Sequence, residues 1–325
     1  MQESRTYPRV TFGSLKKVFQ HGDRPYNIVL IVSVFLTIGL VIGIGYELWR
    51  NSALSRQAFG LSFLYTSEWD PALTNKFGAL PFILGTLITS LIAVLVAVPL
   101  GLGTAIFLAE LAPDWLRQPL SFLAELLAAV PSVIYGLWGL FVFIPIIVKP
   151  FSLLINKTLG FLPLFKGPVF GPSRLAAGLL LAIMVFPTIT AISRDVLKAI
   201  PNSQREAAMA LGATRWEMIS QILIPYGTSG LLGAIILGLG RALGETIAVT
   251  MVIGNNLDLT ASLLHPGYTM ASLIANEFTE ATTNLYLNAL VEVGLILFFI
   301  TLVLNLLARL LIWRVSLRTR TEARV

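Results

Sequence analysis

Arg241 and Glu245 are the residues whose types and spacing best suit chemistry in this chain. Both occur in the apolar run GLGRALGETIAV, where they are four residues apart and would share one face of a helix. A guanidinium in lipid costs roughly 2.5–3.5 kcal/mol on insertion scales, so its presence needs a reason. Its planar fork of donors matches a tetrahedral oxyanion such as phosphate. The pair therefore predicts an anion path with Glu245 as resting counter-ion, although a structural pair that locks two helices fits the same residues.

Other ionisable groups are sparse. Glu125 and Glu292 also occur at apolar positions, and we expect each to face protein or a water-filled path. Gly240 and Gly244 bracket Arg241 in a GxxxG spacing, which predicts close approach of a neighbouring helix on that face. The chain has no cysteine, two histidines and no Walker A, G-x-S-x-G or H-E-x-x-H motif. These absences argue against a metal centre, a catalytic role or a nucleotide site in this chain.

The composition indicates a membrane protein, because 56% of residues are hydrophobic and only 12% are charged, against roughly 25% charged in soluble domains. The first apolar run is long enough to remain as an anchor. Apolar runs of about 20 residues predict six transmembrane helices in an all-α fold. These spans are Tyr26–Tyr46, Leu80–Leu108, Leu120–Val148, Leu175–Ile192, Thr228–Ile253 and Leu285–Trp313.

The distribution of Lys and Arg predicts the orientation. Basic residues are concentrated before the first span, between spans four and five, and after the last span. By the positive-inside rule both termini are cytoplasmic. The predicted organisation is a basic segment 1–25, a transmembrane domain 26–313 and a basic tail 314–325. The net charge of +6 is thus explained by membrane orientation, and no aromatic-basic RNA motif indicates nucleic acid.

The loop between spans four and five carries a second constellation, EAAMALGATRWEMISQILIP. It is polar on one face and separates two long apolar segments, which predicts a structured helix-turn in the cytoplasm. Glu206, Ala207 and Ala208 would form the helix, and Gly212 would end it in the left-handed conformation.

This loop, with its Gly212, Ile222 and Pro225 spacing, resembles the EAA loop of ABC-importer permeases. Departing from the usual pattern, Ile224 replaces a leucine. Four further stretches are similar to PstC-type permeases of bacterial phosphate importers: FLYTSEWDP, AELLAAVPSVIYGLWGL, GRALGETIAVTMVIGN and ANEFTEA. The resemblance implies the type I ABC-importer permease fold, with a cytoplasmic coupling helix at Glu206, Ala207, Ala208 and Gly212.

The resemblance also implies a set of partners in the bacterial plasma (inner) membrane. These are a second, PstA-type permease, two copies of an ABC ATPase that bind ATP and Mg, and an external phosphate-binding protein. Arg241 and Glu245 would lie in the translocation path. Molybdate, sulfate or phosphonate permeases are the nearest alternatives. An ion-coupled secondary transporter is a further alternative, but it would leave the EAA loop unexplained, and a membrane-embedded enzyme lacks a plausible catalytic set.

Overall fold

The computed structural model describes residues 24–322, so nearly all of the predicted basic segment 1–25 lies outside the described residues. The chain divides into two units at residue 50. Helix α2 (Arg24–Asn51) belongs to the first unit, and its apolar side chains are exposed on every face. A helix that is apolar all round suits a lipid environment.

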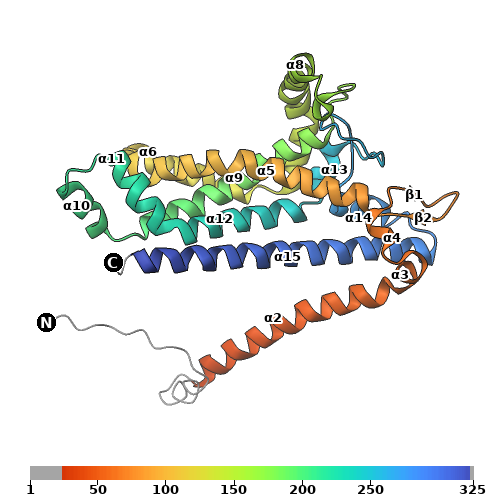
Figure 1. Ribbon diagram of the computed structural model, residues 1–325, viewed down its shortest axis with the longest axis horizontal. Coiled ribbons are helices and arrows are strands. Elements are labelled where there is room, and N and C mark those ends of the chain that lie inside the picture. The colour runs from red at the N-terminus through yellow and green to blue at the C-terminus, as the bar shows by residue number, and fades with distance from the viewer. Residues whose placement is uncertain (1–23, 323–325) are drawn as a thin grey trace. The chain divides into compact units, whose positions relative to one another are not determined.

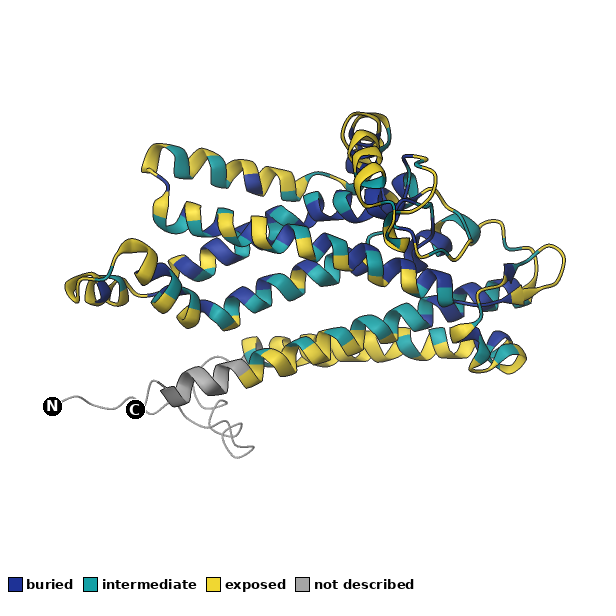
Figure 2. Cartoon of the chain, turned by 45° about the horizontal axis from the view of Figure 1, so that its top comes forward, coloured by how far each residue is buried: buried dark blue, intermediate teal, exposed yellow. Residues whose placement is uncertain are grey.

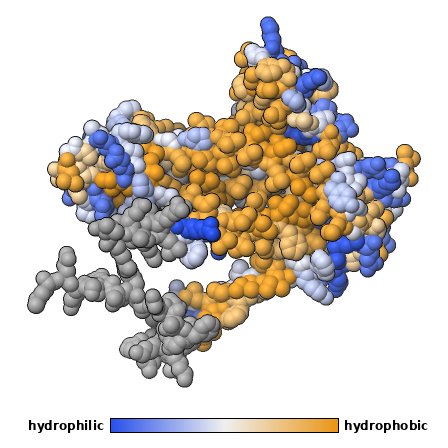
Figure 3. Space-filling model, in the orientation of Figure 1, coloured by the Kyte–Doolittle hydropathy of each residue, from blue (hydrophilic) through white to orange (hydrophobic). Residues whose placement is uncertain are grey.

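Within the described residues, six helices are long and apolar enough to cross a membrane. This finding confirms the predicted number of spans and the all-α class. Apolar side chains cover the middle of the second unit, whereas polar ones gather toward its ends (Figure 3). The observed spans are Tyr26–Asn51, Leu80–Leu111, Ser132–Leu159, Arg174–Lys198, Arg215–Gly244 and Asn284–Arg314.

Most residues of helix α9 (Arg174–Lys198) are buried, and buried residues gather in the middle of the second unit (Figure 2). Helix α9 packs along α5 (Leu80–Ile106), and α12 (Ile224–Gly244) packs against both helices. The α5–α9 contact depends on small residues, because a Cβ at Gly178 would lie 2.7 Å from the Ile92 Cβ. The long helix α15 (Asn284–Glu322) packs on α12 (Figure 1). These four helices form the frame that positions the site.

The prediction of a single transmembrane helix over Leu120–Val148 is wrong. Helix α6 (Asp114–Ala129) stops before Pro131, because the proline ring forces the preceding Val130 into an extended conformation. A new helix begins as α7 (Ser132–Trp138) and continues through a π-helical segment into α8 (Lys149–Leu159). The third span is therefore Ser132–Leu159.

The predicted fifth span, Thr228–Ile253, is also two elements. Helix α12 ends at Gly244, Glu245 is extended with φ −69° and ψ 126°, and α13 (Ile247–Ile253) follows. The span instead begins earlier, at α11 (Arg215–Glu217), which leads through the π-helical segment η5 (Met218–Leu223) into α12. Helix α12 consequently ends partway along α15 (Figure 1).

Short elements close the end of the second unit opposite α10 (Asn202–Ala210) (Figure 1). They are α3 (Ala53–Phe59), α4 (Ser62–Tyr65), the antiparallel hairpin β1 (Trp69–Asp70) with β2 (Lys76–Phe77), and α14 (Met270–Glu277). Trp69, Phe77 and Tyr286 pack ring against ring in their core. The aromatic stretch between the first two spans is thus part of a packed cap.

Candidate translocation and coupling sites

Arg241 lies in the last turn of α12 and is partly buried. Its Nη1 donates a hydrogen bond of 3.0 Å to Oγ1 of Thr188 in α9. Carbonyl groups at a helix C-terminus are left without helical partners and favour a nearby cation. This position explains how the chain tolerates the charge, and the neutral hydroxyl leaves most guanidinium donors free for another partner.

Glu245 does not form the predicted pair with Arg241. The helix ends between them, and in the described part of the chain no ion pair joins their side chains within 4.0 Å. Oε1 of Glu245 instead accepts a hydrogen bond of 3.3 Å from the backbone N–H of Ala248. The carboxylate thereby caps the first turn of α13, a favourable place for negative charge.

Two interrupted helices meet beside Arg241. Helices α7 and α13 pack together so closely that a Cβ at Gly136 would lie 2.5 Å from Sδ of Met251. The Tyr135 hydroxyl bridges the break before α7 by donating to the Leu127 carbonyl oxygen at 2.8 Å. Arg241 itself lies four residues before the extended Glu245, where α12 ends. The guanidinium is therefore next to irregular backbone, which at membrane depth is tolerated where it is buried or lines a cavity.

The GxxxG expectation fails for contacts within this chain. A Cβ at Gly240 or Gly244 would meet no atom within 4 Å, whereas one at Gly238 would lie 2.7 Å from Cγ1 of Val185 in α9. The glycine that brings α12 against α9 is therefore Gly238. The surface at Gly240 and Gly244 is open.

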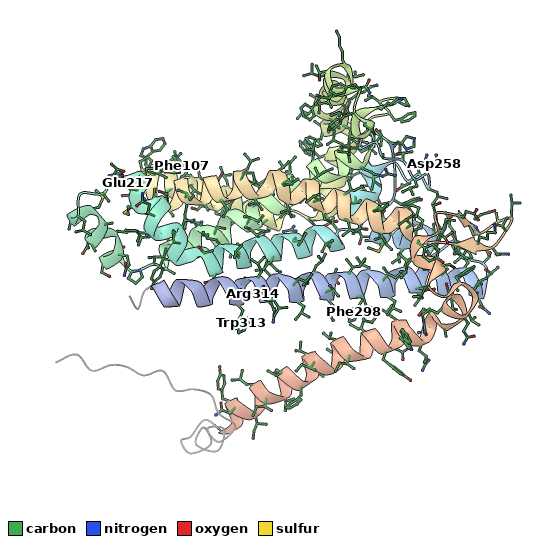
Figure 4. The ribbon with its side chains drawn as sticks, in the orientation of Figure 1. Phe107, Glu217, Asp258, Phe298, Trp313 and Arg314 are labelled. Carbon is green, nitrogen blue, oxygen red and sulfur yellow. The ribbon has the colours of Figure 1, made fainter. Side chains whose placement is uncertain are left out.

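The loop after α9 forms the predicted helix-turn. Helix α10 (Asn202–Ala210) ends at Gly212, which has φ +84°. Backbone N–H groups of Gly212 and Ala213 donate to the carbonyls of Met209 and Ala208, at 3.0 and 3.1 Å. Thr214 and Glu217 then form a capping box that begins α11. This part of the chain and Phe107 lie at one end of the bundle, and Asp258 lies toward the other (Figure 4).

The predicted coupling residues do not share one surface. Glu206, Ala207 and Gly212 are exposed, but Ala208 is only 2% exposed and packs into the protein's own core. Sequence reasoning missed the large apolar side chains on the exposed face of this loop, where Leu211 is 89% and Trp216 65% exposed. The sequence feature that could have identified Leu211 and Trp216 is that they are large apolar residues within a polar segment.

Comparison with known proteins matches residues 97–320 to the family described as binding-protein-dependent transport system inner membrane component. The chain belongs to this family. Proteins named phosphate transport system permease protein PstC are similar over nearly its whole length. Those of Xylella fastidiosa (strain 9a5c) and Haemophilus influenzae are each 47% identical, covering 91% and 97% of this chain and 92% and 98% of theirs. That of Mesorhizobium japonicum is 43% identical over 98% of both chains.

Solved structures support the same fold. A chain of the inward-facing MetNI methionine ABC transporter matches with a TM-score of 0.55 and 16% identity, over 76% of this chain and 99% of that one. A bacterial ABC transporter involved in alginate import matches with a TM-score of 0.50 and 17% identity, over 92% and 98%. At these identities the likeness concerns the fold alone. It confirms the predicted type I ABC-importer permease fold of a multi-pass membrane protein.

In this family member, a second arginine holds the helix-turn in place. Arg205, which sequence reasoning missed, donates to the Glu110 carboxylate, with Nη2 2.7 Å from Oε1. It also donates to the carbonyls of Leu197 and Ile200 near the end of α9. No sequence signal connects Glu110 with Arg205, because 95 residues separate them.

Of the two remaining ionisable groups, Glu292 faces protein as expected, whereas the side chain of Glu125 is 57% exposed. Glu125 pairs with the buried Arg194 at 3.1 Å, and Glu292 is only 5% exposed. No cluster of three or more His, Asp or Glu side chains suited to a metal ion occurs in residues 24–322.

Proposed function

We propose that this chain is the permease subunit of an ATP-driven importer of inorganic phosphate and forms half of its pore. The observation that carries the proposal is the similarity, over almost the entire chain, to three proteins named phosphate transport system permease protein PstC. Arg241 adds a chemical reason, because its guanidinium has donors left for a tetrahedral oxyanion.

Arg241 binds the anion transiently during passage. In the absence of an anion, the guanidinium is stabilised by the C-terminal carbonyls of α12 and by Thr188. An arriving anion therefore has few existing interactions to displace. Binding of this kind stays weak enough for release, as conduction requires. Glu245 contributes indirectly, by capping α13 beside the path.

The partners complete the transporter. A second permease of the PstA type packs on the open face at Gly240 and Gly244, where small residues permit close helix contact. Two copies of an ABC ATPase supply ATP hydrolysis and hold ATP and Mg, because this chain has no Walker A motif. An external phosphate-binding protein delivers the anion, and membrane lipid surrounds the apolar surface.

The ATPase docks on the helix-turn. Glu206 and Ala207 on α10 supply the exposed helix surface, and Gly212 fixes the turn. Leu211 and Trp216 add apolar area, which an aqueous loop exposes at a cost unless a partner covers it. Ala208 contributes through its buried side chain, which packs α10 against the rest of the permease.

Both termini and the helix-turn are cytoplasmic, as the basic residues indicate. The chain has no native cysteine, so single cysteines can report on this orientation. An impermeant thiol reagent applied to intact cells should label Asn284→Cys and spare Ser203→Cys. Labelling of Ser203→Cys from outside would contradict the orientation.

Transport by the complete complex tests the function. The permeases and ATPase, reconstituted in proteoliposomes with the binding protein, should take up radiolabelled phosphate only when ATP is present on the ATPase side. Excess unlabelled phosphate should abolish this uptake, whereas sulfate, molybdate and phosphonate should leave most of it. Preferential uptake of one of these other anions would assign the chain to that substrate, and uptake driven by an ion gradient without ATP would support a secondary transporter.

A further inference from the structure

One guanidinium makes a set of polar contacts between the helix-turn and the rest of the second unit. The Arg205 side chain is 18% exposed and its partner Glu110 only 8%, so their ion pair is largely protected from water. Nε and Nη2 of Arg205 both reach the Glu110 carboxylate, at 3.2 and 2.7 Å. Nη1 donates to the carbonyl oxygen of Ile200 at 2.6 Å, and Nη2 also donates to that of Leu197 at 2.8 Å. All three nitrogens of the guanidinium are engaged.

The partners of Arg205 belong to the ends of two different spans. Glu110 lies in the π-helical segment η2 (Phe107–Leu111), which continues α5 and ends the second span. Leu197 lies in the last turn of α9, the fourth span. Helix α10 is joined to α9 through a short connection in the chain, but its link to the second span exists only through space.

The other contacts of α10 with the spans are apolar. Ala208 packs in a cluster with Leu197, Ile219 and, at its edge, Ile106 of α5. Such contacts are non-directional and can slide. The forked ion pair fixes both distance and direction, because a guanidinium and a carboxylate meet in two parallel hydrogen bonds. Arg205 is therefore suited to transmit a displacement of α10 rather than absorb it.

Helix α9 also leads to the anion site. Thr188, which receives the hydrogen bond from Arg241, precedes Leu197 by nine residues on the same unbroken helix. At ~1.5 Å per residue the two positions are about 14 Å apart along the axis. Helix α5 packs along α9. A movement applied at Arg205 thus reaches the region of Arg241 through two rigid, packed elements.

We infer that Arg205, held by Glu110, is the positioning residue that transmits movement of α10 to the second and fourth spans. The inference rests on the proposed function, in which an ATPase moves α10. Without the ion pair, α10 would still dock on the ATPase through its exposed face. The ATPase would then hydrolyse ATP while the spans followed its movement incompletely.

The test uses the complete complex in proteoliposomes and measures phosphate imported per ATP hydrolysed. Arg205→Ala removes the hydrogen bonds that the guanidinium makes to Glu110, Leu197 and Ile200. Glu110→Gln removes the negative charge of the partner but keeps an oxygen acceptor. Lys198→Ala is the matched control, because this exposed cation directly follows Leu197 in the sequence and makes no ion pair among the described residues. The amount of assembled complex is measured for each variant by co-purification of the ATPase.

Arg205→Ala should lower the transport ratio by roughly 2- to 30-fold, the range expected when a residue that carries coupling is removed. Glu110→Gln should lower the transport ratio by a smaller factor, and Lys198→Ala should leave it at the parental value. If Arg205 only stabilised the fold, Arg205→Ala would reduce the amount of complex and leave the ratio unchanged, which would overturn the inference. If Arg205→Ala fails to assemble, an unchanged ratio for assembled Glu110→Gln would overturn it equally.

The parental complex separates this inference from the proposed function. If it imports no phosphate but another anion, the function fails, and the same variants are scored with that anion per ATP. If it imports phosphate and the Arg205 and Glu110 variants keep its ratio, the inference alone fails.

Discussion

Arg205 and Arg241 are both partly buried arginines in the second unit, yet their surroundings are opposite. Arg205 donates to one carboxylate and to backbone carbonyls at the end of α9, so its donors and its charge are satisfied inside the chain. Arg241 donates to one threonine hydroxyl and forms no ion pair among residues 24–322. The same type of side chain therefore occurs in two different environments in this chain, one with its charge satisfied and one with donors left over.

The difference follows from the free energy of placing a charge away from water. A buried cation that has a full set of acceptors fixes its neighbours, and removing one partner leaves an uncompensated charge. A cation held mainly by a helix C-terminus keeps unsatisfied donors, which favours an incoming anion. We therefore propose that Arg205 belongs to the framework and Arg241 to the transport path, and the following predictions test this division from the largest effect to the smallest.

The largest effect is expected at Arg241. Arg241→Gln removes the charge but keeps a polar side chain, so phosphate uptake should fall by roughly ten- to hundredfold, as the loss of ~1.5–3 kcal/mol in hydrogen bonds to a charged group predicts. Arg241→Lys should be intermediate, because a lysine lacks the planar fork. ATP hydrolysis and the amount of assembled complex should stay near the parental values. Uptake and hydrolysis are measured in the same proteoliposomes.

A double variant distinguishes a binding role from a structural pair. Because Glu245 caps α13 and does not contact Arg241, Glu245→Gln should add its own small effect to that of Arg241→Gln. A compensating pair would behave differently: the double variant would recover the thermal stability that each single variant lost. Uptake by the double variant at the parental rate would assign both residues to the framework and remove the contrast with Arg205.

A smaller effect is expected at Gly212, which ends α10 with φ +84°. A Cβ there meets no atom within 4 Å, so the cost of a substitution arises from the backbone alone. Gly212→Val should strain the turn by about 1–2 kcal/mol and lower phosphate uptake per ATP. Gly212→Asn is the control, since asparagine tolerates the left-handed conformation, and should stay near the parent. Equal ratios for the two variants would show that the turn does not affect coupling.

Sequence alone sufficed for the parts of this fold that depend on local composition. The six apolar runs need only length and hydropathy, and the turn at Gly212 needs only its own backbone preference. The breaks at Pro131 and Glu245 were harder to predict. Proline is compatible with either a kink or a stop, and the extended Glu245 is stabilised by a cap on the next helix.

The candidate site was predictable in its residue types and not in its contacts. Arg241 stands out in an apolar run, but its partner Thr188 is on another helix, 53 residues away. Glu110 and Arg205 are 95 residues apart, and either alone reads as an ordinary charge at a helix end. Pairings of this kind arise from tertiary packing, so spacing rules within one helix assigned Glu245 to Arg241 incorrectly.

The smallest effect is expected in the cap, where the charge is negative. Glu277 in α14 is partly buried, and its Oε2 accepts hydrogen bonds from Nε1 of Trp69 at 2.7 Å and from the Tyr286 hydroxyl at 2.6 Å. Burial raises the pKa of Glu277 above 4.5, the nearby Glu280 adds to this, and the two donors oppose it. Unlike Arg205, this partly buried group has no opposite charge within 4.0 Å among the described residues.

The direction in which Glu277 makes the stability of the protein depend on pH follows from proton linkage. The folded state binds the Glu277 proton more tightly than the unfolded state, so the stabilisation is complete below pH 4.5 and is lost as the pH rises through the folded pKa. Glu277→Gln keeps an oxygen acceptor for Trp69 and Tyr286 but cannot titrate. Between pH 5 and pH 8 the Tm of the parent should therefore fall further than that of the variant, at about 2–4 °C for each kcal/mol of stability in a domain of this size. Other titrating groups contribute equally to both proteins. An identical fall in Tm for the parent and the variant would show that the charge of Glu277 does not destabilise the cap.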